Sequence, residues 1–66
     1  MKFIKLGFTI VEVSKIIYAT LDLKNRTITV LCIQDYKFTN GYDTVDLAIE
    51  SFDWLSDTLI EFNKAQ

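Results

Sequence analysis

The 66-residue chain has no proline, no histidine and a single cysteine, Cys32, and these absences exclude several kinds of protein. Without histidine, acid–base catalysis and metal binding lose the side chain that they use most often. One cysteine cannot form a disulfide within the chain, which argues against a secreted disulfide scaffold. Cys32 lies in an apolar run, so we expect its thiol to be buried and structural.

Long hydrophobic runs are absent too. The longest stretch without a charged residue is 27–34, far short of the ~20 residues that a membrane-spanning helix needs. The serines and threonines have no base to activate them, and the two glycines form no phosphate-binding loop. We therefore expect a non-enzymatic cytoplasmic protein (in the host cytoplasm if the chain is viral), with no cofactor, no metal site and no membrane partner.

Basic residues are scarce in the second part of the chain. Residues 1–37 carry six basic and three acidic side chains, whereas residues 38–66 carry six acidic side chains and one lysine. The two parts have net charges of +3 and −5, which give the total of −2. Charge placement influences which partners a surface attracts and says little about fold. The asymmetry is therefore a clue to partners.

Hydrophobic residues are plentiful. They make up half of the chain, and nine residues are aromatic. A chain of this length forms one domain, over 1–66, and buries only ~60% of the surface that its unfolded form exposes. Apolar surface that the core leaves over often enters an oligomer interface in small folds, so we expect a homodimer.

Alternating apolar and polar residues predict three strands, over 3–13, 16–23 and 26–34. In the first strand the apolar positions shift after Ile10, which predicts a bulge or bend there. The second and third strands flank Lys24-Asn25, and asparagine tolerates the backbone conformation of a tight hairpin turn.

This two-residue loop fixes which residues of the hairpin face each other. One face pairs Leu21 with Ile28, Ala19 with Val30 and Ile17 with Cys32, and all six side chains are apolar. The opposite face pairs Asp22 with Thr27, Thr20 with Thr29, Tyr18 with Leu31 and Ile16 with Ile33. The first face is expected to cover the core. The apolar end of the second is the candidate dimer face, with Ile16, Tyr18, Leu31 and Ile33.

The last third of the chain predicts an amphipathic helix over 44–63, with Asp43 or Thr44 at its start. Its core stripe is Val45, Ala48, Phe52, Leu55, Leu59 and Phe62. Before the helix, 35–39 is either a fourth strand or part of the connection, and Asn40-Gly41 predicts a turn. The fold class is α+β, a three- to four-stranded antiparallel β-meander with the C-terminal helix packed on one face.

The exposed side of this helix is the candidate functional site. Its acidic residues follow helical spacing, and no Lys or Arg lies between them before Lys64. Pairs of Glu and Lys four residues apart would stabilise the helix. Trp54 and Leu47 are expected together on the side away from the core, and an exposed Trp is typical of interface hot spots. The predicted partner-binding residues are Asp46, Leu47, Glu50, Asp53, Trp54, Asp57 and Glu61. Solubility alone is an equal explanation of the carboxylates.

A short segment resembles the helix region of HicB-type antitoxins, which are small acidic α+β proteins that bind a basic toxin. The resemblance consists of Gly41-Tyr42-Asp43-Thr44, then Ala48 and a long acidic helix. The Gly-Tyr and Pro-Gly-Cys-like features that usually precede that helix are absent. The resemblance implies a regulator with a basic protein partner and identifies no functional residue here.

The function that the sequence favours is a small non-catalytic regulator or inhibitor that engages a basic protein surface. Compact acidic proteins of this size are familiar among virus- and plasmid-encoded inhibitors. One alternative is a β-sheet nucleic-acid-binding module, with Phe8, Tyr18 and Tyr36 stacking on bases, although the isoelectric point of about 4.8 argues against it. A HicB-like antitoxin and a structural homo-oligomer are two further candidate functions.

Overall fold

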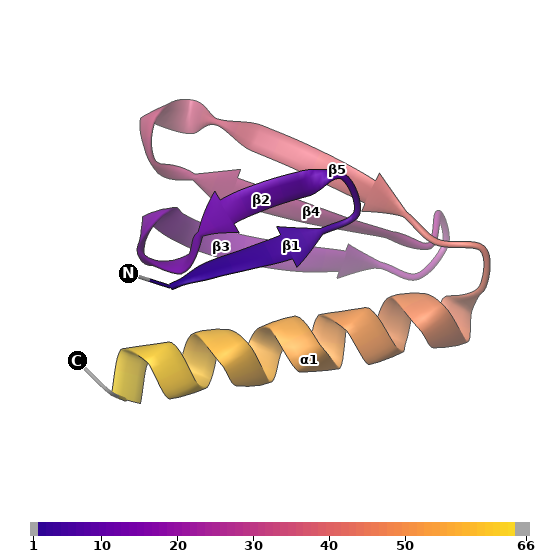
Figure 1. Ribbon diagram of the computed structural model, residues 1–66. Helices are drawn as coiled ribbons and strands as arrows, with labels where there is room; N and C mark the ends of the chain where they lie inside the picture. The colour runs from indigo at the N-terminus through magenta and orange to yellow at the C-terminus, as the bar shows by residue number, and fades with distance from the viewer. Residues whose placement is uncertain (1, 65–66) are drawn as a thin grey trace.

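The computed structural model describes residues 2–64 (Figure 1). The strands are β1 (Phe3–Leu6), β2 (Thr9–Glu12), β3 (Ile16–Asp22), β4 (Thr27–Cys32) and β5 (Lys37–Gly41), and the helix is α1 (Val45–Lys64). Two short 3-10 turns, Val13–Lys15 and Ile33–Asp35, join β2 to β3 and β4 to β5. The predicted α+β class is confirmed. Residues 1 and 65–66 of the predicted domain lie outside the described residues.

The central unit is a three-stranded antiparallel meander in the order β3-β4-β5. The middle strand, β4, alternates half-buried and buried residues, as a strand covered on one face does. Ile28, Val30 and Cys32 point into the core, as predicted. The opposite face carries a row of three threonines, Thr20, Thr29 and Thr39, one from each strand.

The predicted pairing of β3 with β4 is confirmed from Asp22–Thr27 to Tyr18–Leu31 and is wrong beyond that point. A bulge lies between Ile16 and Tyr18, so that Ile16 faces Cys32 in place of Ile17. A bulge inserts one residue and reverses the faces of those that precede it.

The turn between β3 and β4 has four residues, 23–26, where two were predicted. The Asp22 carboxylate accepts hydrogen bonds from the backbone N–H groups of Lys24 (3.0 Å) and Asn25 (3.2 Å) and from the Asn25 side chain. Arg26 closes the turn with a positive φ of 55°. The turn is longer than predicted by one residue on each side, so the predicted strand pairing next to it is unchanged.

The single strand predicted over 3–13 is wrong, because Gly7 and Phe8 form a two-residue turn between β1 and β2. Leu6 pairs with Thr9 across this turn, and Gly7 has a φ of +61°. A positive φ at the first turn residue alone is the pattern of a type II′ hairpin turn. The chain therefore reverses at Gly7, which buries Leu6 and exposes Phe8 and Ile10.

Two segments from opposite parts of the chain cover the same face of the three-stranded sheet. In Figure 1 the β1-β2 hairpin lies in front of the sheet and α1 runs along its lower side. The core contains Ile4 and Leu6 from β1, Val11 and Val13 from the second strand and its turn, the three β4 residues, and Leu55 from α1. The tip of the hairpin approaches β5, where the Asn40 amide lies so close to Gly7 that an added Cβ would be 2.7 Å from its Oδ1 atom.

The strand that precedes the helix is β5, Lys37–Gly41. It lies two residues later than the fourth strand considered over 35–39 from the sequence. Gln34 and Asp35 have positive φ values of 65° and 60°, which end β4 earlier than predicted and turn the chain into β5. Asn40-Gly41, predicted as a turn, ends β5 and is paired with Ile28 and Thr27.

The helix begins at Val45, and Thr44 is its N-cap: the Thr44 hydroxyl accepts a 3.1 Å hydrogen bond from the backbone N–H of Leu47. Ala48 and Leu55 are fully buried, and Phe52, Leu59 and Phe62 are half-buried against the core. Val45, predicted in the stripe, is exposed at the start of the helix.

Candidate functional site

The five predicted carboxylates of α1 all point to solvent. None of them accepts a side-chain hydrogen bond within residues 2–64, and no Lys or Arg nitrogen of that segment lies within 4.0 Å of them. Their charge is therefore not neutralised by the described part of the chain. The exposed residues are Asp46, Glu50, Asp53, Asp57 and Glu61.

Trp54 and Leu47 lie together, as predicted, and line a shallow surface hollow of about 270 Å³ with Glu50 and Ser51. Trp54 is 48% exposed and Leu47 is 47% exposed. Seven residues make nearly two helical turns, which places both side chains on one line along the helix. The hollow thus combines an indole, a leucine and a carboxylate on a rigid element.

These two side chains lie beside the core stripe, and the expectation that they lie opposite it is wrong. Trp54 precedes the fully buried Leu55 by one residue, which is a rotation of about 100° around the helix. The half-buried Ser51 separates the hollow from the core, and Glu50 separates it from the fully solvated side. An apolar centre with a polar rim is the usual composition of an interface.

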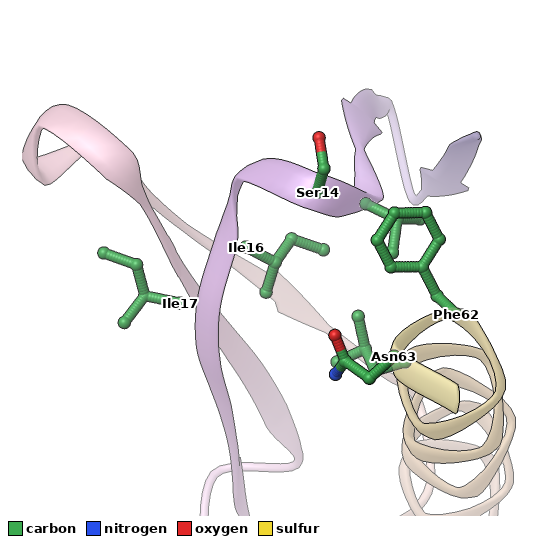
Figure 2. Close-up of a pocket in the computed structure, with 7 residues that line it drawn as sticks. Ser14, Ile16, Ile17, Phe62 and Asn63 are labelled. Atoms are coloured by element: carbon green, nitrogen blue, oxygen red, sulfur yellow. The ribbon is translucent and has the colours of Figure 1, made fainter. Parts of the chain in front are cut away.

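The candidate dimer face is changed by the bulge. Figure 2 shows Ile16 and Ile17 on opposite sides of β3, with Ile16 directed toward Phe62. Ile16 packs against the core and lines a hollow of about 250 Å³ between the 3-10 turn and the end of α1, with Ser14, Phe62 and Asn63 at its rim. The outer face keeps Tyr18 and Leu31, and Ile33 lies just after β4.

The aromatic residues considered for base stacking are not brought together. Tyr18 lies on the outer face of the sheet, Phe8 at the tip of the β1-β2 hairpin, and Tyr36 in the connection before β5. Tyr36 instead contacts Phe38, with 5.9 Å between the ring centroids. Single-strand binders stack successive bases on neighbouring rings along a basic groove.

One exposed apolar surface was missed from the sequence. Phe3, Phe8 and Ile10 are all exposed on the β1-β2 hairpin. Period-two alternation places Phe8 and Ile10 with Leu6 on one face, and this inference fails once the chain reverses. The signal that could have found the turn was Gly7 itself, inside an otherwise β-branched and aromatic segment.

Cys32 is buried in the core, as predicted, and burial raises the pKa of its thiol. Within residues 2–64, no group of three or more His, Cys, Asp or Glu side chains is placed to hold a metal ion. In the same segment no helix has the length and hydropathy required to cross a membrane.

Comparison with protein-family models, with curated proteins and with solved structures finds no match to this chain.

Proposed function

We propose that the protein is a small non-catalytic regulator that binds a basic protein surface through the exposed side of α1. Trp54 and Leu47 form the apolar centre of the contact, and the five helix carboxylates face lysines and arginines of the partner. The proposal rests above all on the hollow at Trp54, because it places an exposed indole beside Glu50, one of five exposed carboxylates that no Lys or Arg within residues 2–64 pairs with.

The competing explanation, solubility, accounts for the carboxylates and leaves the hollow unexplained. Scattered charges solubilise a surface equally well when both signs are mixed, and mixed signs would also stabilise the helix. Five negative charges without positive charges among them instead create an electrostatic field that steers a basic partner toward the helix. A half-exposed Trp on a rigid helix adds the kind of anchor that dominates protein interfaces.

Capture from lysate, with a charge-matched control, tests the proposal. The variant Asp46→Lys, Glu50→Lys, Asp53→Lys reverses the helix charge, and the control Glu12→Lys, Asp35→Lys, Asp43→Lys makes the same change in net charge elsewhere. A partner captured by the wild type should be kept by the control and lost by the helix variant. Trp54→Ala should raise the Kd for the same partner by about tenfold or more. Retention of every partner by the helix variant would show that the carboxylates only solubilise.

Nucleic-acid binding is tested with single-stranded oligonucleotides. A protein that follows a phosphate backbone binds more weakly as salt rises, because binding releases counterions. We expect no salt-sensitive binding at low ionic strength, measured by the fluorescence of Trp54. Tight binding that weakens steeply with salt would replace the proposed function with a nucleic-acid-binding one.

A further inference from the structure

Asn40 and Gly41 end β5 and form the one Asn-Gly pair of the chain. The backbone nitrogen that follows an asparagine is a nucleophile within reach of the side-chain amide carbon. A side chain on the following residue hinders its attack, and glycine has none. The chain has two further asparagines, Asn25 and Asn63, which precede an arginine and a lysine. Asn40 is therefore the asparagine whose neighbour hinders attack least.

The attacking group, the backbone N–H of Gly41, points away from β4. Tyr42 donates a 2.9 Å backbone hydrogen bond to Arg26, and hydrogen-bonded and non-hydrogen-bonded residue pairs alternate along an antiparallel ladder. The next pair, Gly41 with Thr27, is therefore a non-hydrogen-bonded one. On the far side of β5 the described chain, 2–64, adds no further strand and no hydrogen-bond acceptor for this N–H.

The amide nitrogen of Asn40 is not held by a hydrogen bond. Within residues 2–64 its Nδ2 atom is buried without a partner, whereas the Nδ2 atom of Asn25 donates a 2.8 Å hydrogen bond to Asp22. Asn63 lies in the last turn of α1, where the next backbone N–H belongs to the helix hydrogen-bond ladder. Of the three asparagines, Asn40 thus combines an unhindered nucleophile with an amide whose departure breaks no hydrogen bond.

We infer that Asn40 converts itself to aspartate and isoaspartate, with water as the co-reactant. The Gly41 nitrogen forms a bond to Cγ of Asn40 and gives up its proton, the bond between Cγ and Nδ2 breaks, and ammonia leaves with that proton. Water then opens the cyclic imide at either carbonyl carbon, which gives aspartate or isoaspartate. Attack requires rotation about the Cα–C bond of Asn40, which the extended strand opposes. The reaction therefore proceeds when the end of β5 opens, and the ends of elements open most readily.

The product disturbs the contact between β5 and the β1-β2 hairpin. The Asn40 amide lies against the hairpin tip, where a Cβ added to Gly7 would be 2.7 Å from Oδ1 and 3.0 Å from Cγ. A carboxylate at this half-buried position is partly removed from water, which is unfavourable for a charge. Isoaspartate also adds a carbon to the backbone of β5, which disturbs the pairing with Ile28. The modification therefore loosens the hairpin over the core and limits the lifetime of the folded protein.

Peptide mass spectrometry of protein aged under native conditions at mildly alkaline pH tests the site. A hindering side chain and a hydrogen-bonded amide or N–H each raise the barrier, so Asn40 should lose its amide at least about tenfold faster than Asn25 and Asn63. Gly41→Ala should slow the loss at Asn40 by about tenfold or more, because the methyl group hinders the nucleophile. That methyl group meets no atom within 4 Å, and circular dichroism should show the variant folded. Equal rates at the three asparagines, or a wild-type rate in Gly41→Ala, would overturn the inference.

Hydrogen exchange tests the effect on the hairpin. Asn40→Asp reproduces the aspartate product, and Asn63→Asp makes the same change in charge on an exposed residue. The backbone amides of β1 and β2 should exchange about tenfold faster in Asn40→Asp than in the wild type, and Asn63→Asp should leave them unchanged. Fully aged wild-type protein should show the same faster exchange. Hairpin exchange that stays at the fresh wild-type rate after complete conversion would overturn the proposed loosening.

Discussion

The β1-β2 and β3-β4 hairpins of this protein turn by different means. The β1-β2 turn has two residues and depends on the backbone freedom of Gly7, whose φ is +61°. The β3-β4 turn has four residues and depends on a side chain, because the Asp22 carboxylate holds the N–H groups of Lys24 and Asn25. The first hairpin is also pressed against Asn40 at its tip, whereas the second turn is exposed.

The two hairpins therefore respond to different perturbations. A turn that depends on glycine is broken by adding a methyl group and is indifferent to pH. A turn held by an ionised carboxylate tolerates changes in side-chain size and responds to protonation. Their strands differ as well, since β4 is central to the sheet and β1 belongs to a covering layer.

The largest effect is expected from removing core side chains of the two hairpins. Ile28→Ala in β4 empties a site that is fully buried, and Ile4→Ala in β1 empties one at the side of the core. Isoleucine-to-alanine changes in cores cost about 2–5 kcal/mol, so we expect about 3–5 kcal/mol for Ile28 and about 2–3 kcal/mol for Ile4. Urea unfolding followed by Trp54 fluorescence measures both. An equal loss of unfolding free energy in the two variants would mean that the β1-β2 hairpin is as central to the core as β4.

The next effect separates the two glycines. Gly7→Ala forces a positive φ on alanine and pushes a Cβ against the Asn40 amide, so we expect a loss of about 1–2 kcal/mol. Gly41→Ala is the control, because a Cβ there meets no atom of the described chain within 4 Å. It should leave stability unchanged or raise it by up to about 1 kcal/mol. Thermal unfolding of the two variants would contradict this account if their losses were alike.

The smallest effect concerns pH and Asp22. Hydrogen bonds from the side chain and backbone of Asn25 and the backbone of Lys24 lower the pKa of Asp22 from its ordinary value of 3.8. A carboxyl with a lowered folded-state pKa stabilises the protein above pH 3.8, and this contribution is lost as the pH falls through the folded value. Asp22→Asn keeps an acceptor oxygen without the charge. The stability advantage of the wild type over Asp22→Asn should shrink as the pH falls below 3.8, as urea unfolding at several pH values would measure.

Much of the fold followed from local patterns, and the errors have identifiable causes. The β3-β4 pairing and the helix stripe were predictable because one buried face fixes which residues point inward. Two features were not predictable from alternation: the Gly7 turn and the bulge at Ile17. Each changes which face a residue occupies. Gly7 was a local signal for the turn, whereas no residue type marks the bulge between Ile16 and Tyr18. The N-cap, which is Thr44, was one of the two residues considered.

The candidate site was predictable as a set of exposed helix residues, and its shape was not. Helical spacing alone placed Trp54 and Leu47 together and the carboxylates on the solvent side. The hollow is lined by α1 residues alone, so helical spacing also brings its lining together, whereas its depth depends on the side-chain conformations of Leu47 and Trp54, which no local pattern encodes.

The sharing of one sheet face between the first hairpin and α1 has a consequence for biosynthesis. The ribosome delivers all five strands before the segment that contains Leu55 leaves the exit tunnel. Until then Ile28 and Val30 have only the β1-β2 hairpin above them, and part of the core face stays in contact with water. The core can therefore close only once α1 is available, so we expect the sheet and the helix to fold together in one cooperative step.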